Sequence, residues 1–166
     1  MLIKHAFSIH PKTFIMKKIL VAVDYDPSAE KVAETGHALA KAFGAELVLL
    51  HVIAEPSFYS AMAYSPIMGF TGFADPQIPE MVEAELRTEA QRFLDQSKQH
   101  LGDDTIRTVV AEGNFAEAIL ESAKESEADL IVMGRHSKRG LDKLLTGSVA
   151  EKVLHHSTLP LYIIPN

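Results

Sequence analysis

Glycines and cations gather in one stretch of the chain, Met133–Val149. This stretch follows an apolar run, 129–133, and leads into a helical pattern that starts near Ser148. A buried strand, a glycine-bearing loop and a helix start in that order suit an anion, because the first free N–H groups of a helix point beyond its start. Glycine lets the backbone approach a phosphate closely. The loop also carries four cations: Arg135, Lys138, Arg139 and Lys143.

The rest of the chain supplies elements that could position this loop. Short apolar runs typical of buried strands occur at 19–23, 46–53, 106–111, 130–133 and 161–164. Apolar residues at helical spacing occur between them, at 29–43, 82–101, 115–123 and 149–154. Strands that alternate with helices predict an α/β fold with a parallel sheet and right-handed connections.

The loop resembles the nucleotide-binding loop of the universal stress protein family, Gly-x2-Gly-x9-Gly-Ser/Thr. Gly134, Gly147 and Ser148 match that spacing, and Ser137 stands where the family has its second glycine. The resemblance extends over nearly all of 16–165. It implies a Rossmann-like fold with a single open five-stranded parallel sheet, strand order 3-2-1-4-5, and helices on both faces. It also implies an ATP-binding protein of the stress response.

Ligands of open α/β sheets bind at the carboxyl ends of the strands, where the strand order reverses. In the implied order this point lies between the first and fourth strands, so Asp24 and Gly134 would line one crevice. The resemblance places Asp24 at the base or ribose, Val52 at the base, and the start of the last helix at the phosphates. The nucleotide-binding residues that it implies are Asp24, Val52, Met133, Gly134, Ser137, Gly147, Ser148 and Val149.

Several of these residues also have readings that need no ligand. Asp24 could cap the helix that follows it, Val52 fits an ordinary core, and Ser148 could cap the last helix. Ser137 keeps a small side chain but loses the ease with which glycine takes a positive φ. Ser137 is therefore the position that puts tight phosphate binding most in question.

No catalytic residue is predicted. The sequence has no G-x-S-x-G elbow, Walker A loop, complete G-x-G-x-x-G or H-E-x-x-H motif. Asp26 stands where the family often has Ser, and this second carboxylate could attract Mg²⁺ to a bound ATP. We expect a small regulatory or protective module with weak hydrolysis at most. Two alternatives remain open: a domain that binds no nucleotide and acts through protein contacts, and a slow ATPase that uses Asp24 or Asp26 with Mg²⁺.

Length and composition favour one domain in a cytoplasmic protein. The 166 residues suffice for one core, and the formal charge of −6 argues against binding to nucleic acid. The chain has no cysteine and no apolar run of membrane-spanning length. We expect an extension at 1–15 and the family domain at 16–166. A long apolar loop at 54–80 would interrupt this domain, and its apolar content favours packing over ligand contact.

The last apolar run, 161–164, would form an outer strand in the implied order. It carries no charge, and open outer strands tend to pair with another chain. The sequence therefore predicts a homodimer through this strand, while the protein partner is not indicated.

Overall fold

The computed structural model describes residues 15–54, 78–135 and 149–165. Its elements in chain order are β1 (Lys18–Ala22), α1 (Ala29–Phe43), β2 (Glu46–Ile53), α3 (Ile78–Leu101), β3 (Arg107–Glu112), α4 (Phe115–Glu125), β4 (Leu130–Gly134), α5 (Val149–His156) and β5 (Leu161–Ile164). Each strand and helix predicted from the apolar patterns is present. The bounds differ by one residue at several strand ends, by two at the ends of α4 and α5, and by four at the start of α3.

Helix α3 begins earlier than the sequence pattern predicted. The pattern placed its start near Val82 and assigned 54–80 to a loop, but the helix begins at Ile78. Pro79 explains the difference, since proline is favoured in the first turn of a helix, where its missing N–H has no partner to lose. The predicted loop therefore ends before Ile78, and most of it, 55–77, lies outside the described residues.

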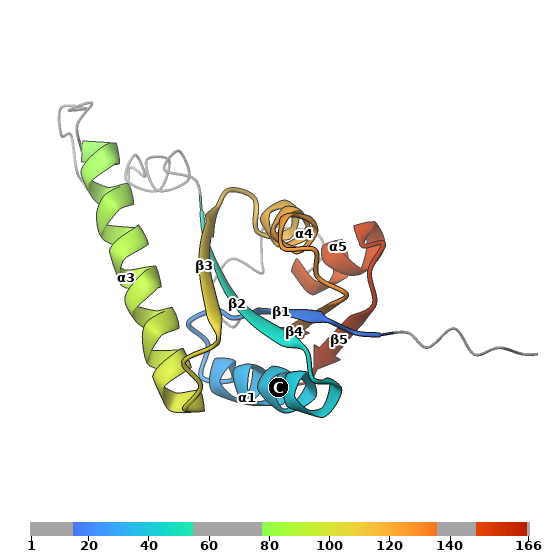
Figure 1. Cartoon of the computed structure of the whole chain (residues 1–166). Helices are drawn as coiled ribbons and strands as arrows, with labels where there is room; N and C mark the ends of the chain where they lie inside the picture. Colours follow the sequence, from blue (N-terminus) through green and yellow to red (C-terminus); the bar gives the residue numbers. More distant parts are fainter. Residues whose placement is uncertain (1–14, 55–77, 136–148, 166) are drawn as a thin grey trace, which may run out of the picture.

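The five strands form one open parallel sheet in the order β3-β2-β1-β4-β5. This confirms the order that the family resemblance implied. Strand β1 lies at the centre, between β2 and β4. The chain moves from β1 outward to β2 and β3, and then crosses to β4 and β5 on the other side (Figure 1). The order thus reverses between β1 and β4.

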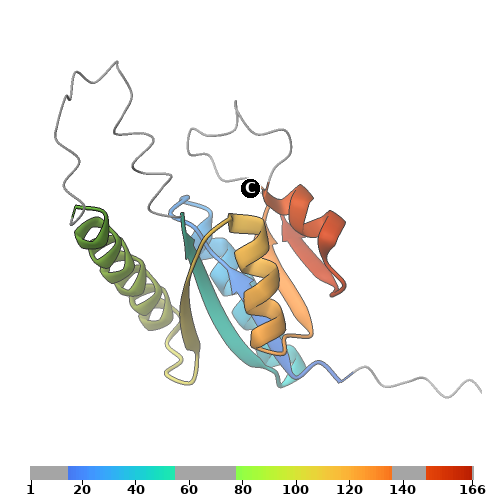
Figure 2. The same cartoon turned by 90° about the horizontal axis from the view of Figure 1, so that it is seen from above.

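Helices cover both faces of the sheet. α1 and α3 pack on one face, and α4 and α5 lie together on the other (Figure 2). Alternate residues of each strand feed the two layers, because successive side chains of a strand point to opposite faces. Ile19 and Val21 belong to the apolar cluster beneath α1 and α3, whereas Leu20 belongs to the cluster beneath α4 and α5. Each such fully buried side chain contributes about 1.5–3 kcal/mol.

Local signals in the sequence explain where the helices begin and end. Asn114 caps α4, and its side-chain oxygen accepts hydrogen bonds from the N–H groups of Ala116 and Glu117. Gly44 ends α1 with φ 65°, a conformation that glycine adopts without strain. Of the helices in the described parts of the chain, none has the length and apolar character needed to cross a membrane.

Candidate functional site

The carboxyl ends of β1, β2 and β4 meet at the centre of the sheet. Ala22, the last residue of β1, is paired with Leu50 on one side and with Met133 on the other. The N–H of Val23 still donates to the carbonyl of Leu50 at 2.9 Å. Asp24 follows directly, so its position lies at the point where the strand order reverses.

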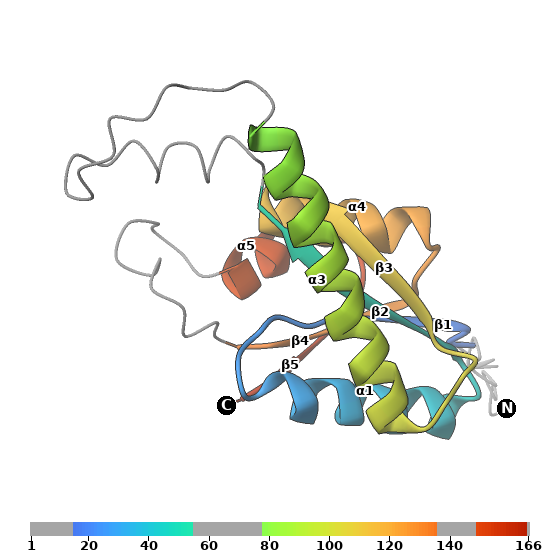
Figure 3. The same cartoon turned by 90° about the vertical axis from the view of Figure 1, so that its left-hand side faces the viewer.

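Three of the predicted residues share the layer beneath α4 and α5. Val52 is 8% exposed and Met133 is 5% exposed, and both belong to the same apolar cluster. Val149, the first residue of α5, is half-buried against this cluster. Because α5 connects two parallel strands, it runs opposite to them and starts at their carboxyl ends (Figure 3). Residues from three distant parts of the sequence thus line one region.

Asp24 is half-buried and takes part in a turn. Its Oδ1 accepts the backbone N–H of Asp26 at 3.0 Å. Asp24 makes no other side-chain hydrogen bond within 15–54, 78–135 and 149–165, so its Oδ2 has no hydrogen-bond partner there. The ligand-free reading of Asp24 as a cap of the next helix is not what the structure has, because Ser28 occupies the N-cap position of α1.

Asp26 holds the start of α1 from within the same loop. It is only 6% exposed, and its Oδ1 accepts both the N–H and the hydroxyl of Ser28, at 2.9 and 2.7 Å. Ser28 itself makes no side-chain capping bond. At the start of α1 it is therefore the carboxylate of Asp26, and not the side chain of Ser28, that bonds the backbone. Its burial and its bonds to Ser28 make it a poor candidate for attracting Mg²⁺.

The remaining predicted residues are split between the end of β4 and the loop after it. Gly134 is half-buried and is the last residue of β4, and the N–H of Arg135 donates to the carbonyl of Ile164 at 2.9 Å. Ser137, Gly147 and Ser148 lie outside the described residues. Their role at the phosphates stays a prediction.

Sequence reasoning missed one residue of this region, His51. It lies on β2 next to Val52 but faces the opposite layer, where its ring packs against the rings of Tyr25 and Phe93. It is 4% exposed, and burial lowers its pKa below the ordinary value. Its Nδ1 lies 2.8 Å from the carbonyl oxygen of Val23. Only its place as a lone histidine inside an apolar strand could have signalled a role.

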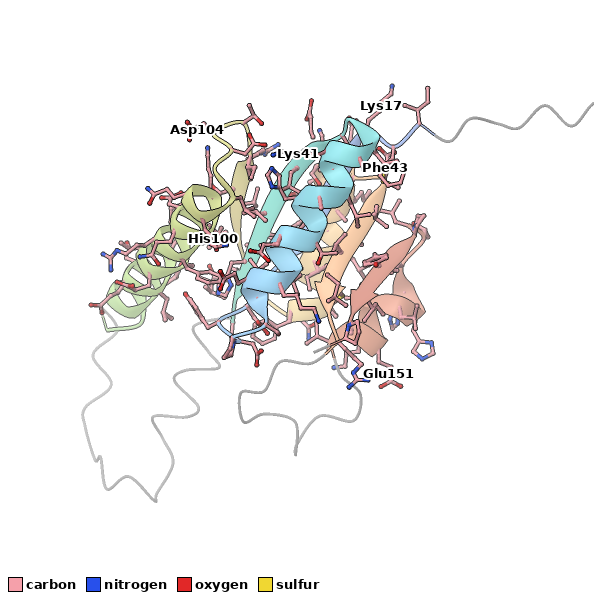
Figure 4. All side chains as sticks on the ribbon, turned by 90° about the horizontal axis from the view of Figure 1, so that it is seen from below. Lys17, Lys41, Phe43, His100, Asp104 and Glu151 are labelled. Carbon is pink, nitrogen blue, oxygen red and sulfur yellow. The ribbon has the colours of Figure 1, made fainter. Side chains whose placement is uncertain are left out.

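A cluster of metal-ligating side chains lies on the outer surface of α1 and α3. Nε2 of His100 lies 3.0 Å from Oε1 of Glu30 and 2.9 Å from Oε1 of Glu34. The hydrogen bond to Glu34, with the charge of Glu30, raises the pKa of His100. His100 lies on the side of α3 toward α1 (Figure 4). All three side chains are exposed, and the arrangement is that of a surface ion pair.

Known proteins match this chain over most of its length. The model of the universal stress protein family matches residues 16–165. Universal stress protein YxiE of Bacillus subtilis is 32% identical over 152 residues, which cover 90% of this chain and 99% of that protein. Universal stress protein MJ0577 of Methanocaldococcus jannaschii is 28% identical over 152 residues, covering 89% of this chain and 94% of that protein.

Solved structures share the fold. The structure of MJ0577 matches with a TM-score of 0.70 and 27% identity, over 92% of this chain and 97% of that one. A universal stress protein in complex with cAMP matches at 0.59 with 19% identity, over 90% of this chain and 97% of that one. The protein from Archaeoglobus fulgidus in complex with dAMP matches at 0.54 with 21% identity, over 90% and 98%. The chain belongs to the universal stress protein family.

Proposed function

We propose that this protein binds ATP at the carboxyl ends of β1, β2 and β4, and that binding rather than turnover is its function. It would act as a small regulatory or protective module in the stress response, in the cytoplasm. The observation that carries the proposal is the convergence of Asp24, Val52, Met133 and Val149 at the point where the strand order reverses. Open α/β sheets bind their ligands at this point.

The chemistry of these residues suits an adenine nucleotide. The buried side chains of Val52 and Met133 offer an apolar surface for a base. The carboxylate of Asp24 is half-buried, and its Oδ2 has no hydrogen-bond partner among the described residues, so it could accept from a base or a ribose hydroxyl. The start of α5 at Val149 supplies the positive end of a helix dipole toward phosphates.

The relatives support the class of ligand at a coarser level. Two of the solved universal stress proteins are complexes with cAMP and with dAMP, and both molecules carry adenine. We extend this to ATP because the loop 134–149 has the glycines, the Ser148 hydroxyl and the cations that a triphosphate needs. Any Mg²⁺ would accompany the phosphates.

The proposal is tested by the small molecules that the purified protein retains. Mass spectrometry after denaturation should find ATP at close to one molecule per chain. Hydrolysis should stay below about 1 s⁻¹, the low end of ordinary enzyme turnover, because the site offers no evident general base for phosphoryl transfer. Faster turnover that depends on Asp24 or Asp26 would favour the slow ATPase instead.

A variant of Ser137 tests the case in which the purified protein retains no nucleotide. If no nucleotide is retained and added ATP does not bind, the result favours the alternative in which the domain acts through protein contacts. Ser137→Gly restores the glycine of the family loop and should then raise the affinity for ATP. An affinity that remains unmeasurable in Ser137→Gly would contradict the proposed site as a whole.

We also propose a homodimer through β5. β5 is an outer strand of the sheet, and its Tyr162 is 47% exposed. The other outer strand, β3, packs against α3. An uncharged outer strand tends to pair, and a two-fold axis lets the same strand pair with itself.

The dimer is tested by sedimentation at micromolar concentration. The side chain of Ile163 is half-buried against the core, so a charge there would also disturb the fold. Tyr162→Lys changes an exposed position and is the cleaner variant. We expect wild type to sediment as a dimer and Tyr162→Lys as a folded monomer. A wild-type protein that sediments as a monomer would contradict the proposed dimer.

A further inference from the structure

Both neighbours of Asp24 in the sequence contact the same side chain. We propose that His51 is a positioning residue for the nucleotide site: it holds Val23 and Tyr25, and thereby fixes the loop that carries Asp24. His51 would not touch the nucleotide, since it faces the layer of α3 whereas Val52 and Met133 face the layer of α4 and α5. This inference rests on the proposed function.

The first contact is a hydrogen bond at the end of β1. Nδ1 of His51 lies 2.8 Å from the carbonyl oxygen of Val23. A carbonyl oxygen can only accept, so Nδ1 carries the hydrogen. Burial lowers the pKa of His51, and the ring is therefore neutral at pH 7 with its hydrogen on Nδ1. The pairing of β1 with β2 ends at Ala22. The bond from His51 therefore connects β2 to the chain one residue beyond the last paired residue of β1.

The second contact is a cluster of three rings. The ring centroid of Tyr25 lies 4.5 Å from that of His51 and 4.9 Å from that of Phe93. His51 and Phe93 complete the cluster at 5.4 Å. Tyr25 is 39% exposed and lies at the surface. The buried ring of His51 contacts it from β2, and the ring of Phe93 contacts it from α3. Separations of this size are favourable for aromatic pairs.

The consequence reaches Asp24 through the backbone. With Val23 and Tyr25 both held, the φ and ψ angles around Asp24 have little freedom, and its Oδ1 keeps the bond to the N–H of Asp26 at 3.0 Å. A loop that is already ordered loses less entropy when a ligand binds. Without the bond from His51 to Val23, the loop would have to be ordered when ATP binds. The affinity for ATP should therefore fall by about 5- to 10-fold, which is the effect of ordering one or two side chains.

Two variants of His51 separate its hydrogen bond from its bulk. His51→Phe keeps a ring but removes the donor, whereas His51→Asn keeps a donor near the position of Nδ1 but removes the ring. Calorimetry with ATP should show a loss of about 5- to 10-fold for His51→Phe and a smaller loss, of about two- to threefold, for His51→Asn, which gives up the ring contact with Tyr25 but keeps the hydrogen bond. A His51→Phe protein that binds ATP as tightly as wild type, or an equal loss in both variants, would overturn the positioning role of the hydrogen bond.

A second readout does not depend on nucleotide. Hydrogen exchange of the ligand-free protein reports the turn directly, through the N–H of Asp26 bonded to Asp24. This amide should exchange at least about 10-fold faster in His51→Phe than in wild type, which corresponds to one hydrogen bond. The amide of Lys18, bonded to Asp129 at the other end of the sheet, is the control and should be unchanged. Unchanged exchange at Asp26 overturns the inference even if wild type binds ATP. If wild type fails to bind ATP but the amide of Asp26 still exchanges faster in His51→Phe than in wild type, the positioning role is supported and only the proposed function is rejected.

Discussion

The two ends of the sheet use their polar side chains in different ways. At the amino ends of the strands, the connections are short, at 44–45, 102–106, 126–129 and 157–160. At the carboxyl ends, two connections are long, at 54–77 and 135–148. Figure 4 shows both ends, with Lys17 and Lys41 at the amino end and Glu151, in the first turn of α5, at the carboxyl end.

Carboxylates at the amino end are committed to the protein's own backbone. Oδ2 of Asp129 accepts the N–H groups of Lys17 and Lys18, at 2.7 and 3.0 Å. Oδ1 of Asp103 accepts the N–H and the hydroxyl of Thr105, and its Oδ2 lies 2.9 Å from Nε2 of His37. Hydrogen bonds to charged acceptors contribute about 1.5–3 kcal/mol each when they are well shielded from water.

Asp24 at the carboxyl end makes a single bond of this kind and keeps an oxygen that no other described residue bonds. We infer that the polar side chains at the amino end of the sheet serve stability, whereas Asp24 at the carboxyl end is available for the proposed binding. Substitutions at the amino end should lower stability without changing affinity. Substitution of Asp24 should do the reverse.

The largest effect is expected at Gly36, in the middle of α1, between the two ends of the sheet. A Cβ at Gly36 would lie 2.3 Å from Cγ2 of Val21, which is fully buried in β1 and cannot retreat. Gly36→Val should lower the free energy of unfolding by about 3 kcal/mol, the upper part of the range for overpacked cores. Thermal melting should show a fall of about 6–12 °C.

The control for Gly36→Val is the double variant with Val21→Ala, which removes the methyl groups that clash. The double variant should be less destabilised than the two single variants would be if their effects added. Simple additivity would show that the close approach of α1 to β1 is not the cause.

The next effect belongs to the amino end. Asp129→Ala removes the acceptor of two backbone N–H groups and should lower the free energy of unfolding by about 2 kcal/mol. Asp129→Asn keeps an acceptor oxygen and should lose about half as much. Chemical denaturation measures both. The affinity for ATP should stay within about twofold of wild type, and a larger loss would break the separation between the two ends.

Asp24→Ala is the matched change at the carboxyl end. It removes one turn bond and should cost about 1 kcal/mol of stability or less. The affinity for ATP should fall by about 5- to 10-fold, less than for a change in the phosphate loop. Asp24→Asn keeps an acceptor for the N–H of Asp26, but it removes the charge and replaces the second oxygen with an NH2 donor. If calorimetry gives the same affinity for wild type and Asp24→Ala, Asp24 is a turn residue and nothing more.

The smallest effect is expected between the two ends, at His100. The hydrogen bond to Glu34 and the charge of Glu30 raise the pKa of His100 in the folded protein above 6.5. Its contribution to stability is therefore fully present below the unfolded pKa and is lost as the pH rises through the folded pKa. The melting temperature of wild type should exceed that of His100→Gln at about pH 6, and the difference should vanish by about pH 9. A difference that grows with pH would contradict this account.

The sequence predicted the strands well because a strand buried on both faces is a continuous apolar run. The sequence was less informative where local and distant signals disagree. The start of α3 was missed because the apolar residues before Val82 show no helical period, although Pro79 marks a first turn. The strand order could not be derived from periodicity, which says nothing about neighbours in space, and it came from the family resemblance.

The site divides in the same way. Asp24 and Met133 could be assigned to one region because they follow or end strands that become neighbours. His51 could not, because its role depends on which residues the fold brings to its ring, and no spacing in the sequence records that. Sequence reasoning therefore finds residues at the ends of elements more readily than residues that support them from another layer.

Calorimetric titration of ATP into wild type and Gly147→Val tests the central claim most directly. Gly147 belongs to the loop that the sequence assigns to the phosphates, and a side chain there would obstruct the approach of the backbone. We expect one ATP per chain for wild type, and a Gly147→Val affinity weaker by about 10- to 150-fold, the loss of one charge-assisted hydrogen bond. The melting temperature should not change. The absence of binding heat with wild type, or equal affinities in the two proteins, would contradict the account.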